Sequence, residues 1–150
     1  LNYGEYLPNF LENYETSYKI IWVQGPFAKA PKLQNKSKVK VVYNPENIQN
    51  IIEESDIVLS AYGTLFFESL FRECATILLP VGNLCEKEEL KQLRKKDVCL
   101  ISESIHEITS LLRILETDVY TKNKIISNSI SVFKENNGLD KFTKIISKFI

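Results

Sequence analysis

The chain has 150 residues, 44% of them apolar and 25% charged, and its formal net charge is zero. This length suffices for one globular domain with its own core, and a neutral chain is not attracted to nucleic acid or to an anionic membrane. No apolar run approaches the roughly 20 residues of a membrane span, and no signal peptide is evident. We therefore expect a cytoplasmic domain that has no transmembrane segment and does not bind nucleic acid.

Along the chain, the apolar residues of Tyr6–Tyr14 are spaced as in a helix, and the spacing after them is that of a strand. The run Tyr18–Gln24 is rich in β-branched and aromatic residues and predicts a strand buried on both faces. Gly25-Pro26 ends this strand, and Val39–Tyr43 predicts a second one after a polar loop. The first third of the chain therefore predicts one helix followed by two strands.

The pair Asn44-Pro45 is typical of a helix start, because asparagine is a favoured N-cap and proline a favoured first helical residue. We expect Asn44 to cap a helix over Glu46–Ser55. A buried strand is then predicted at Ile57–Ser60, followed by a glycine turn and a helix that begins at Thr64.

Strands and helices continue to alternate in the second half. Further strands are predicted at Ala75–Pro80 and Val98–Ser102, and further helices at Cys85–Lys96, Ser104–Leu115, Asp118–Glu135 and Leu139–Ile150, with a break at Asn136-Asn137-Gly138. This alternation predicts parallel strands with right-handed crossovers, that is, a doubly wound, Rossmann-like α/β sheet. Ligands of such sheets bind beyond the carboxyl ends of the strands.

The turn at Tyr62-Gly63 lies at such a carboxyl end. A helix that opens directly from a glycine turn presents free N–H groups and the positive end of its dipole, which together favour an anion. Glu68 follows on the same helix face as Thr64, where it can accept hydrogen bonds from a sugar diol. The pattern indicates nucleotide recognition. The structural alternatives are that Gly63 only allows the turn, that Thr64 only starts the helix, and that Glu68 only interacts with the helix dipole.

Three segments resemble the C-terminal domain of GT-B-fold nucleotide-sugar enzymes. Val23-Gln24-Gly25-Pro26-Phe27 resembles a strand ending in G-P-F/Y, Asn47–Glu68 resembles the family's helix, strand and "sagGsTlyE"-like turn, and Asn136–Phe142 resembles its closing segment. The chain looks closest to the UDP-sugar hydrolase of pseudaminic-acid biosynthesis and to spore-coat polysaccharide proteins. It is more distantly similar to the peptidoglycan N-acetylglucosaminyltransferase.

The resemblance implies that a UDP-sugar lies along this domain. The turn at Tyr43-Asn44 would meet the base, Gly63 to Leu65 would bind the diphosphate, Glu68 would accept the ribose hydroxyls, and the loop with Asn83 would approach the sugar. The implied nucleotide-binding residues are Gly25, Pro26, Phe27, Tyr43, Asn44, Tyr62, Gly63, Thr64, Leu65, Glu68 and Asn83.

No catalytic residue is predicted, because the chain offers no base near Gly63, and His106 is expected on the surface of a helix. In the resembled enzymes the base comes from an N-terminal α/β domain. The chain also lacks methionine, which indicates a single domain excised from a longer, two-domain polypeptide.

Three cysteines without metal-ligand spacing are expected to be small buried hydrophobes, and we expect neither a metal nor another cofactor. The sequence thus predicts the donor-binding half of a glycosyltransferase or UDP-sugar hydrolase of surface polysaccharide biosynthesis. The alternative is a non-catalytic Rossmann-like module for protein contacts. Tyr62, in place of a small residue, favours that alternative.

Overall fold

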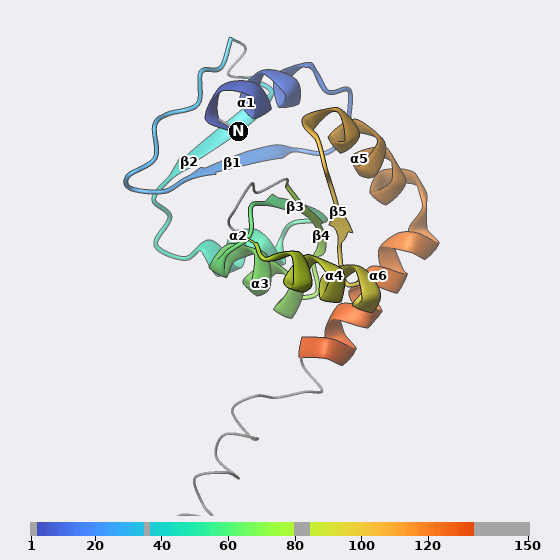
Figure 1. Ribbon diagram of the computed structural model, residues 1–150. Coiled ribbons are helices and arrows are strands. Elements are labelled where there is room, and N and C mark those ends of the chain that lie inside the picture. Colours follow the sequence, from blue (N-terminus) through green and yellow to red (C-terminus); the bar gives the residue numbers. More distant parts are fainter. Residues whose placement is uncertain (1–2, 35–36, 80–84, 134–150) are drawn as a thin grey trace, which may run out of the picture. The chain divides into compact units, whose positions relative to one another are not determined.

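The computed structural model describes residues 3–34, 37–79 and 85–133 (Figure 1). The chain divides into two compact units, Leu1–Asn50 and Ile51–Ile150. Both units are of the α/β kind with parallel strands, as expected, and the five strands divide between a two-stranded and a three-stranded sheet. None of the helices in the described ranges is long and apolar enough to cross a membrane.

The first unit contains α1 (Tyr3–Asn13), β1 (Ile20–Gln24) and β2 (Val39–Tyr43). The two strands are parallel, with Ile20 opposite Val39 and Gln24 opposite Tyr43. The prediction of β1 as a strand buried on both faces is wrong, because Ile21 is 40% exposed. Besides the start of α2, this unit offers only α1 as a described helix to cover its sheet, so part of the apolar surface of the strands stays open to solvent.

The helix after β2 starts later than the sequence predicts. Its range is Ile48–Glu53 (α2), so the prediction of Asn44 as N-cap is wrong. The Asn44 N–H still donates to the carbonyl of Gln24 at 2.8 Å, and its backbone is left-handed with φ 39°. The side-chain oxygen of Asn47 instead accepts the N–H of Asn50 at 3.3 Å, which satisfies one of the free donors at the helix start.

The second unit contains a three-stranded parallel sheet in the order β3-β4-β5. β3 (Ile57–Ser60) and β4 (Ala75–Leu78) are joined by α3 (Thr64–Phe71), and β4 and β5 (Leu100–Ile101) by α4 (Lys87–Lys96). Right-handed crossovers between strands in sequential order place both connecting helices on the same face of the sheet. β3 has the predicted bounds, whereas β5 is shorter than predicted.

Two further helices follow β5. The predicted helix at Ser104–Leu115 begins as a 3₁₀ turn, η1 (Ile105–Glu107), and continues as α5 (Ile108–Thr117). α6 (Val119–Phe133) starts after Asp118, whose carboxylate accepts the N–H of Thr121 at 3.0 Å. The predicted break at 136–138 and the predicted helix at 139–150 lie outside the described residues.

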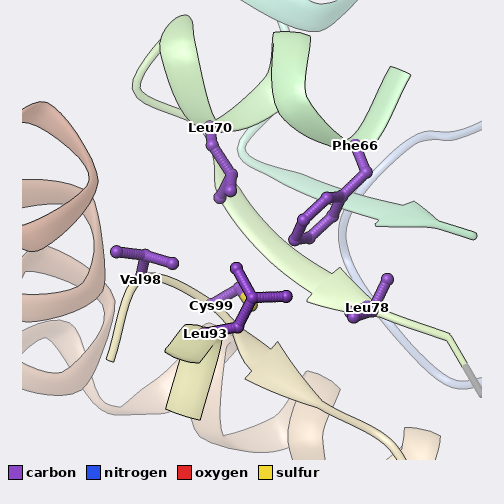
Figure 2. Packing of buried hydrophobic residues seen from close by; sticks show 6 residues of the cluster. All are labelled: Phe66, Leu70, Leu78, Leu93, Val98 and Cys99. Atoms are coloured by element: carbon purple, nitrogen blue, oxygen red, sulfur yellow. The ribbon is translucent and has the colours of Figure 1, made fainter. Parts of the chain in front are cut away.

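The core of the second unit forms between α3, β4 and α4 (Figure 2). Every residue of β4 is buried, which shows that both faces of this central strand are covered. The side chains that converge on the core are Phe66, Leu70, Leu78, Leu93, Val98 and Cys99. This core fixes the position of α3 and therefore of the turn that precedes it.

Three buried hydroxyl groups lie where α3, β4 and α6 pack together. Ser69 Oγ on α3 and Thr76 Oγ1 on β4 lie 2.9 Å apart, and the Ser69 hydroxyl also donates to the carbonyl of Phe66 at 2.7 Å. The Ser129 hydroxyl on α6 donates to the carbonyl of Leu70 at 2.8 Å. Buried polar groups are costly unless they are hydrogen-bonded. The Ser129 bond therefore ties α6 to α3, whereas the Ser69 and Thr76 hydroxyl groups donate to nearby carbonyls of Phe66 and Cys74.

Candidate functional site

The turn between β3 and α3 has the geometry that the sequence predicts. α3 begins at Thr64, and Gly63 is its N-cap, with φ 155° and no side-chain cap. The first hydrogen bond of the helix runs from the Phe67 N–H to the Gly63 carbonyl, at 3.2 Å. The N–H groups of Thr64, Leu65 and Phe66 therefore have no partner within the helix and point out of its end.

The space beside Gly63 is open. A Cβ atom added at Gly63 would meet no atom within 4 Å, so the space directly beside its Cα atom is open. An open approach combined with outward N–H groups and the positive end of a helix dipole is the arrangement that binds phosphate groups in proteins. This turn is the centre of the candidate site.

Glu68 lies one helical turn after Thr64, on the same face of α3. Its side chain is partly exposed, and Phe67 and Phe71 beside it are 36% and 52% exposed. The solvent-accessible side of α3 thus carries a carboxylate together with two partly exposed aromatic side chains. A carboxylate in this position can accept two hydrogen bonds from vicinal hydroxyl groups.

Tyr62 does not extend freely into solvent. Its ring packs against Phe66, with centroids 5.9 Å apart, and against Phe67 at 5.3 Å in an edge-on arrangement. Burial, a hydrogen bond to Glu89 and the negative charge of that residue raise the pKa of Tyr62 to about 12. The phenol hydroxyl therefore stays protonated at neutral pH.

A second group of predicted residues gathers at the carboxyl end of β1 and β2. The Tyr43 hydroxyl donates to the Pro26 carbonyl at 3.3 Å, and the Ala28 N–H closes the turn by donating to the Gly25 carbonyl at 3.2 Å. The Phe27 side chain is fully exposed. The parallel register explains this arrangement, because it brings both strand ends to the same edge of the sheet.

The predicted residues are thus assembled into two groups, one in each compact unit. The first comprises Gly25, Pro26, Phe27, Tyr43 and Asn44, and the second Tyr62, Gly63, Thr64, Leu65 and Glu68. Asn83 lies outside the described residues. Glu89, whose negative charge contributes to the raised pKa of Tyr62, was not predicted from the sequence, since the Glu86–Glu89 pattern indicates only a helix start.

A cavity of about 260 Å³ lies in the first unit, away from the group at the carboxyl ends of β1 and β2. Its lining comes from the first unit and consists of Tyr14, Glu15, Thr16, Tyr18, Ile20 and Lys38. Ile20 is the first residue of β1, and Lys38 directly precedes β2, so the cavity lies at the amino end of the strands. Parallel sheets bind their ligands at the opposite end, and we place the candidate site there on chemical grounds.

The remaining reactive groups do not form a catalytic centre among the described residues. Cys74, Cys85 and Cys99 are buried, as predicted. Burial is the main cause that raises the pKa of Cys74 to about 11 and that of Cys99 to about 12, so both thiols stay protonated and unreactive near neutral pH. His106 is exposed in η1, as expected, and the described part of the chain holds no cluster suited to a metal ion.

Comparison of the chain with protein-family models, with curated proteins and with solved structures gave no match.

Proposed function

We propose that the chain is a nucleotide-sugar-binding domain, the donor-binding half of a GT-B-type glycosyltransferase or UDP-sugar hydrolase. The observation that carries this proposal is the β3–Gly63–α3 turn, with its outward N–H groups and open approach. Glu68, one turn later on the same helix face, supplies an acceptor for the ribose diol beside the phosphates. Hydrogen-bond donors for phosphate next to an acceptor for a diol match the diphosphate and the ribose of a nucleoside diphosphate.

In this proposal the chain binds and orients the donor, and an N-terminal α/β domain of a longer cytoplasmic protein supplies the catalytic base. The resemblance also implies a doubly wound, Rossmann-like fold, the C-terminal half of a GT-B fold. The reaction belongs to surface polysaccharide biosynthesis.

Calorimetric titration with UDP tests the proposal. Glu68→Ala removes hydrogen bonds to a charged acceptor worth about 1.5–3 kcal/mol, so we expect the Kd for UDP to rise about ten- to a hundredfold. Removal of the 2′-hydroxyl from the nucleotide should weaken the wild type similarly and Glu68→Ala little, because the partner is already absent. Glu54→Ala removes an exposed carboxylate of the same unit and serves as the control.

The alternative is a non-catalytic module whose nucleotide site is degenerate. The packing of Tyr62 over α3 and α4 favours it, because a tyrosine used as a core side chain suits a scaffold as well as it suits a ligand site. Failure of the wild-type chain to bind UDP, CDP and their sugar conjugates at millimolar concentration would reject donor binding and support this alternative.

A further inference from the structure

The cavity of the first unit is built around the connection between α1 and β1. Its volume of about 260 Å³ is below the roughly 300–1,000 Å³ of pockets for drug-sized molecules, so a ligand that fits it is smaller than a nucleotide-sugar. The lining combines two aromatic rings, an aliphatic side chain, a hydroxyl group and two opposite charges, which belong to Tyr14, Tyr18, Ile20, Thr16, Lys38 and Glu15.

Local contacts hold the walls of this cavity. Tyr14 is 7% exposed, and its ring packs against that of Phe10 with centroids 5.6 Å apart. The Thr16 hydroxyl accepts the N–H of Tyr18 at 3.1 Å, which fixes the turn that leads into β1. These contacts form within the chain itself. A ligand therefore meets walls that are already ordered, and little affinity is lost to ordering them.

Two side chains of opposite charge line the cavity without pairing with each other. Glu15 and Lys38 are both exposed, and among the residues that the structure describes neither charged group has an ion pair or a hydrogen bond. A single ligand in the cavity can therefore meet both charges. A ligand with a carboxylate and an ammonium group satisfies the two side chains together, whereas a singly charged ligand satisfies only one of them.

The rest of the lining favours the same kind of ligand. The face of a tyrosine ring attracts an ammonium group, and Tyr14 and Tyr18 supply two such rings. Ile20 adds apolar surface for a hydrocarbon group. An α-amino acid carries a carboxylate, an ammonium group and a side chain on one carbon atom, so it offers a partner for each part of this lining.

We propose that this cavity binds an α-amino acid with an apolar side chain, whose carboxylate meets Lys38 and whose ammonium group meets Glu15. None of the residues that line the cavity belongs to the candidate nucleotide site. The inference therefore goes beyond the proposed function and does not rest on it.

Titration with three related compounds tests the class of ligand. L-phenylalanine carries both charges, phenylethylamine lacks the carboxylate, and phenylpropionate lacks the ammonium group. We expect L-phenylalanine to bind with a Kd of about 1 mM, since both charged side chains are exposed, and each analogue to bind about tenfold more weakly. Calorimetry measures the affinities. Trp22, the single tryptophan, reports binding by fluorescence, because it lies on the same face of the sheet as Ile20.

Single substitutions assign a role to each charge. Lys38→Gln should weaken the binding of L-phenylalanine about tenfold and leave that of phenylethylamine unchanged, because this analogue has no carboxylate. Glu15→Gln should weaken L-phenylalanine similarly and leave phenylpropionate unchanged. Lys40→Gln and Glu46→Gln are the charge-matched controls, since both residues are exposed in the same unit and neither lines the cavity.

Failure of the wild type to bind L-phenylalanine at about 10 mM would overturn the proposal, and so would equal affinities for the three compounds. Binding that stays unchanged in both Lys38→Gln and Glu15→Gln would place the compound elsewhere on the chain, which would also overturn it. The titrations with UDP probe a different group of residues, so either proposal can fail without the other.

Discussion

At the scale of single residues, the backbone conformation of Gly63 favours glycine at this position. Its φ of 155° is a conformation that side chains with a Cβ rarely adopt, although an added methyl group would meet no atom within 4 Å. Any cost of substitution must therefore come from the backbone and not from a clash. A substitution at Gly63 therefore measures the cost of backbone strain without a contribution from steric clash.

We expect Gly63→Ala to lower the free energy of unfolding by about 1–3 kcal/mol, the usual cost of a strained backbone conformation. Urea denaturation followed by circular dichroism measures this change. Gly25→Ala is the matched control, because its added Cβ also meets no atom and its φ is not in the strained range. That variant should be neutral or slightly stabilising. Equal losses in both variants would contradict the backbone explanation.

Residue identities could be predicted where chemistry is local. Gly63 and the helix start at Thr64 followed from the strand that precedes them, and the structure has both. The packing of Tyr62 could not be predicted, because the core that it contacts includes Leu93 of a different helix and no periodicity links the two. Asn44 shows a third case, because both Asn44 and Asn47 precede the helix and either could cap it. The Asn44 N–H instead bonds to the Gln24 carbonyl at the end of β1, and Asn47 accepts the N–H at the helix start.

At the scale of elements, α6 depends on the charge of its capping residue. The Asp118 carboxylate accepts the Thr121 N–H at 3.0 Å and the Thr121 hydroxyl at 2.7 Å. These bonds, led by the one to the hydroxyl, lower the pKa of Asp118. A folded-state pKa below the unfolded one stabilises the fold above the ordinary carboxyl pKa of about 3.9, and this contribution is lost as the pH falls through the lowered value.

Asp118→Asn should keep the cap and lose this pH dependence, since the amide oxygen still accepts the Thr121 N–H. We expect the difference in melting temperature between wild type and Asp118→Asn to shrink as the pH falls from about 6 to about 2, measured by calorimetric scans. Glu54→Gln replaces an exposed carboxylate of the same unit, at a position that begins no helix, and serves as the control. A difference that stays constant over this range would show that the cap does not titrate.

Element bounds could be predicted where apolar runs meet turn residues. β2 and β3 have the predicted ranges, since each is a short apolar run with a polar or glycine boundary. β5 is shorter than predicted: Val98 and Cys99 are buried in the core as an apolar run predicts, but only Leu100 and Ile101 pair with β4. An apolar run therefore indicates burial more reliably than it indicates hydrogen bonding between strands.

At the scale of the whole molecule, the chain carries a separate probe in each compact unit. Trp22 is the single tryptophan and lies on β1, whereas all three cysteines lie in the second unit. The first unit has a two-stranded sheet, which is marginally stable by itself, and the second has three strands around the core of α3, β4 and α4. The two units are therefore expected to differ in stability.

We expect Trp22 fluorescence to change at a lower urea concentration than thiol exposure does. Leu70→Ala removes a fully buried side chain of the second unit and should cost about 2–5 kcal/mol there. It should shift the thiol transition and leave the Trp22 transition in place. Coincident transitions that move together in the variant would show that the units unfold as one.

The strand pattern could predict the α/β class and the parallel direction, but not how the strands are shared between sheets. Alternation along the chain shows that strands need crossovers, whereas pairing depends on which edges meet in space. The same limit applies to the candidate site. Each turn could be located from its own residues, while the assembly of Gly25, Pro26 and Tyr43 needed the register of two strands.

The buried hydroxyl groups of Ser69, Thr76 and Ser129 also bear on how far this core can vary. Leucine, isoleucine and phenylalanine tolerate exchange for one another when the total volume is kept, because dispersion contacts have no direction. A hydrogen bond is directional, and the Ser129 hydroxyl reaches the Leu70 carbonyl only when α6 packs against α3 as it does here. Substitutions in the apolar part of the core should therefore change the stability of the second unit by small steps. Thr76→Val, in contrast, would remove the polar contact with Ser69 and make the packing of α3 on β4 less specific.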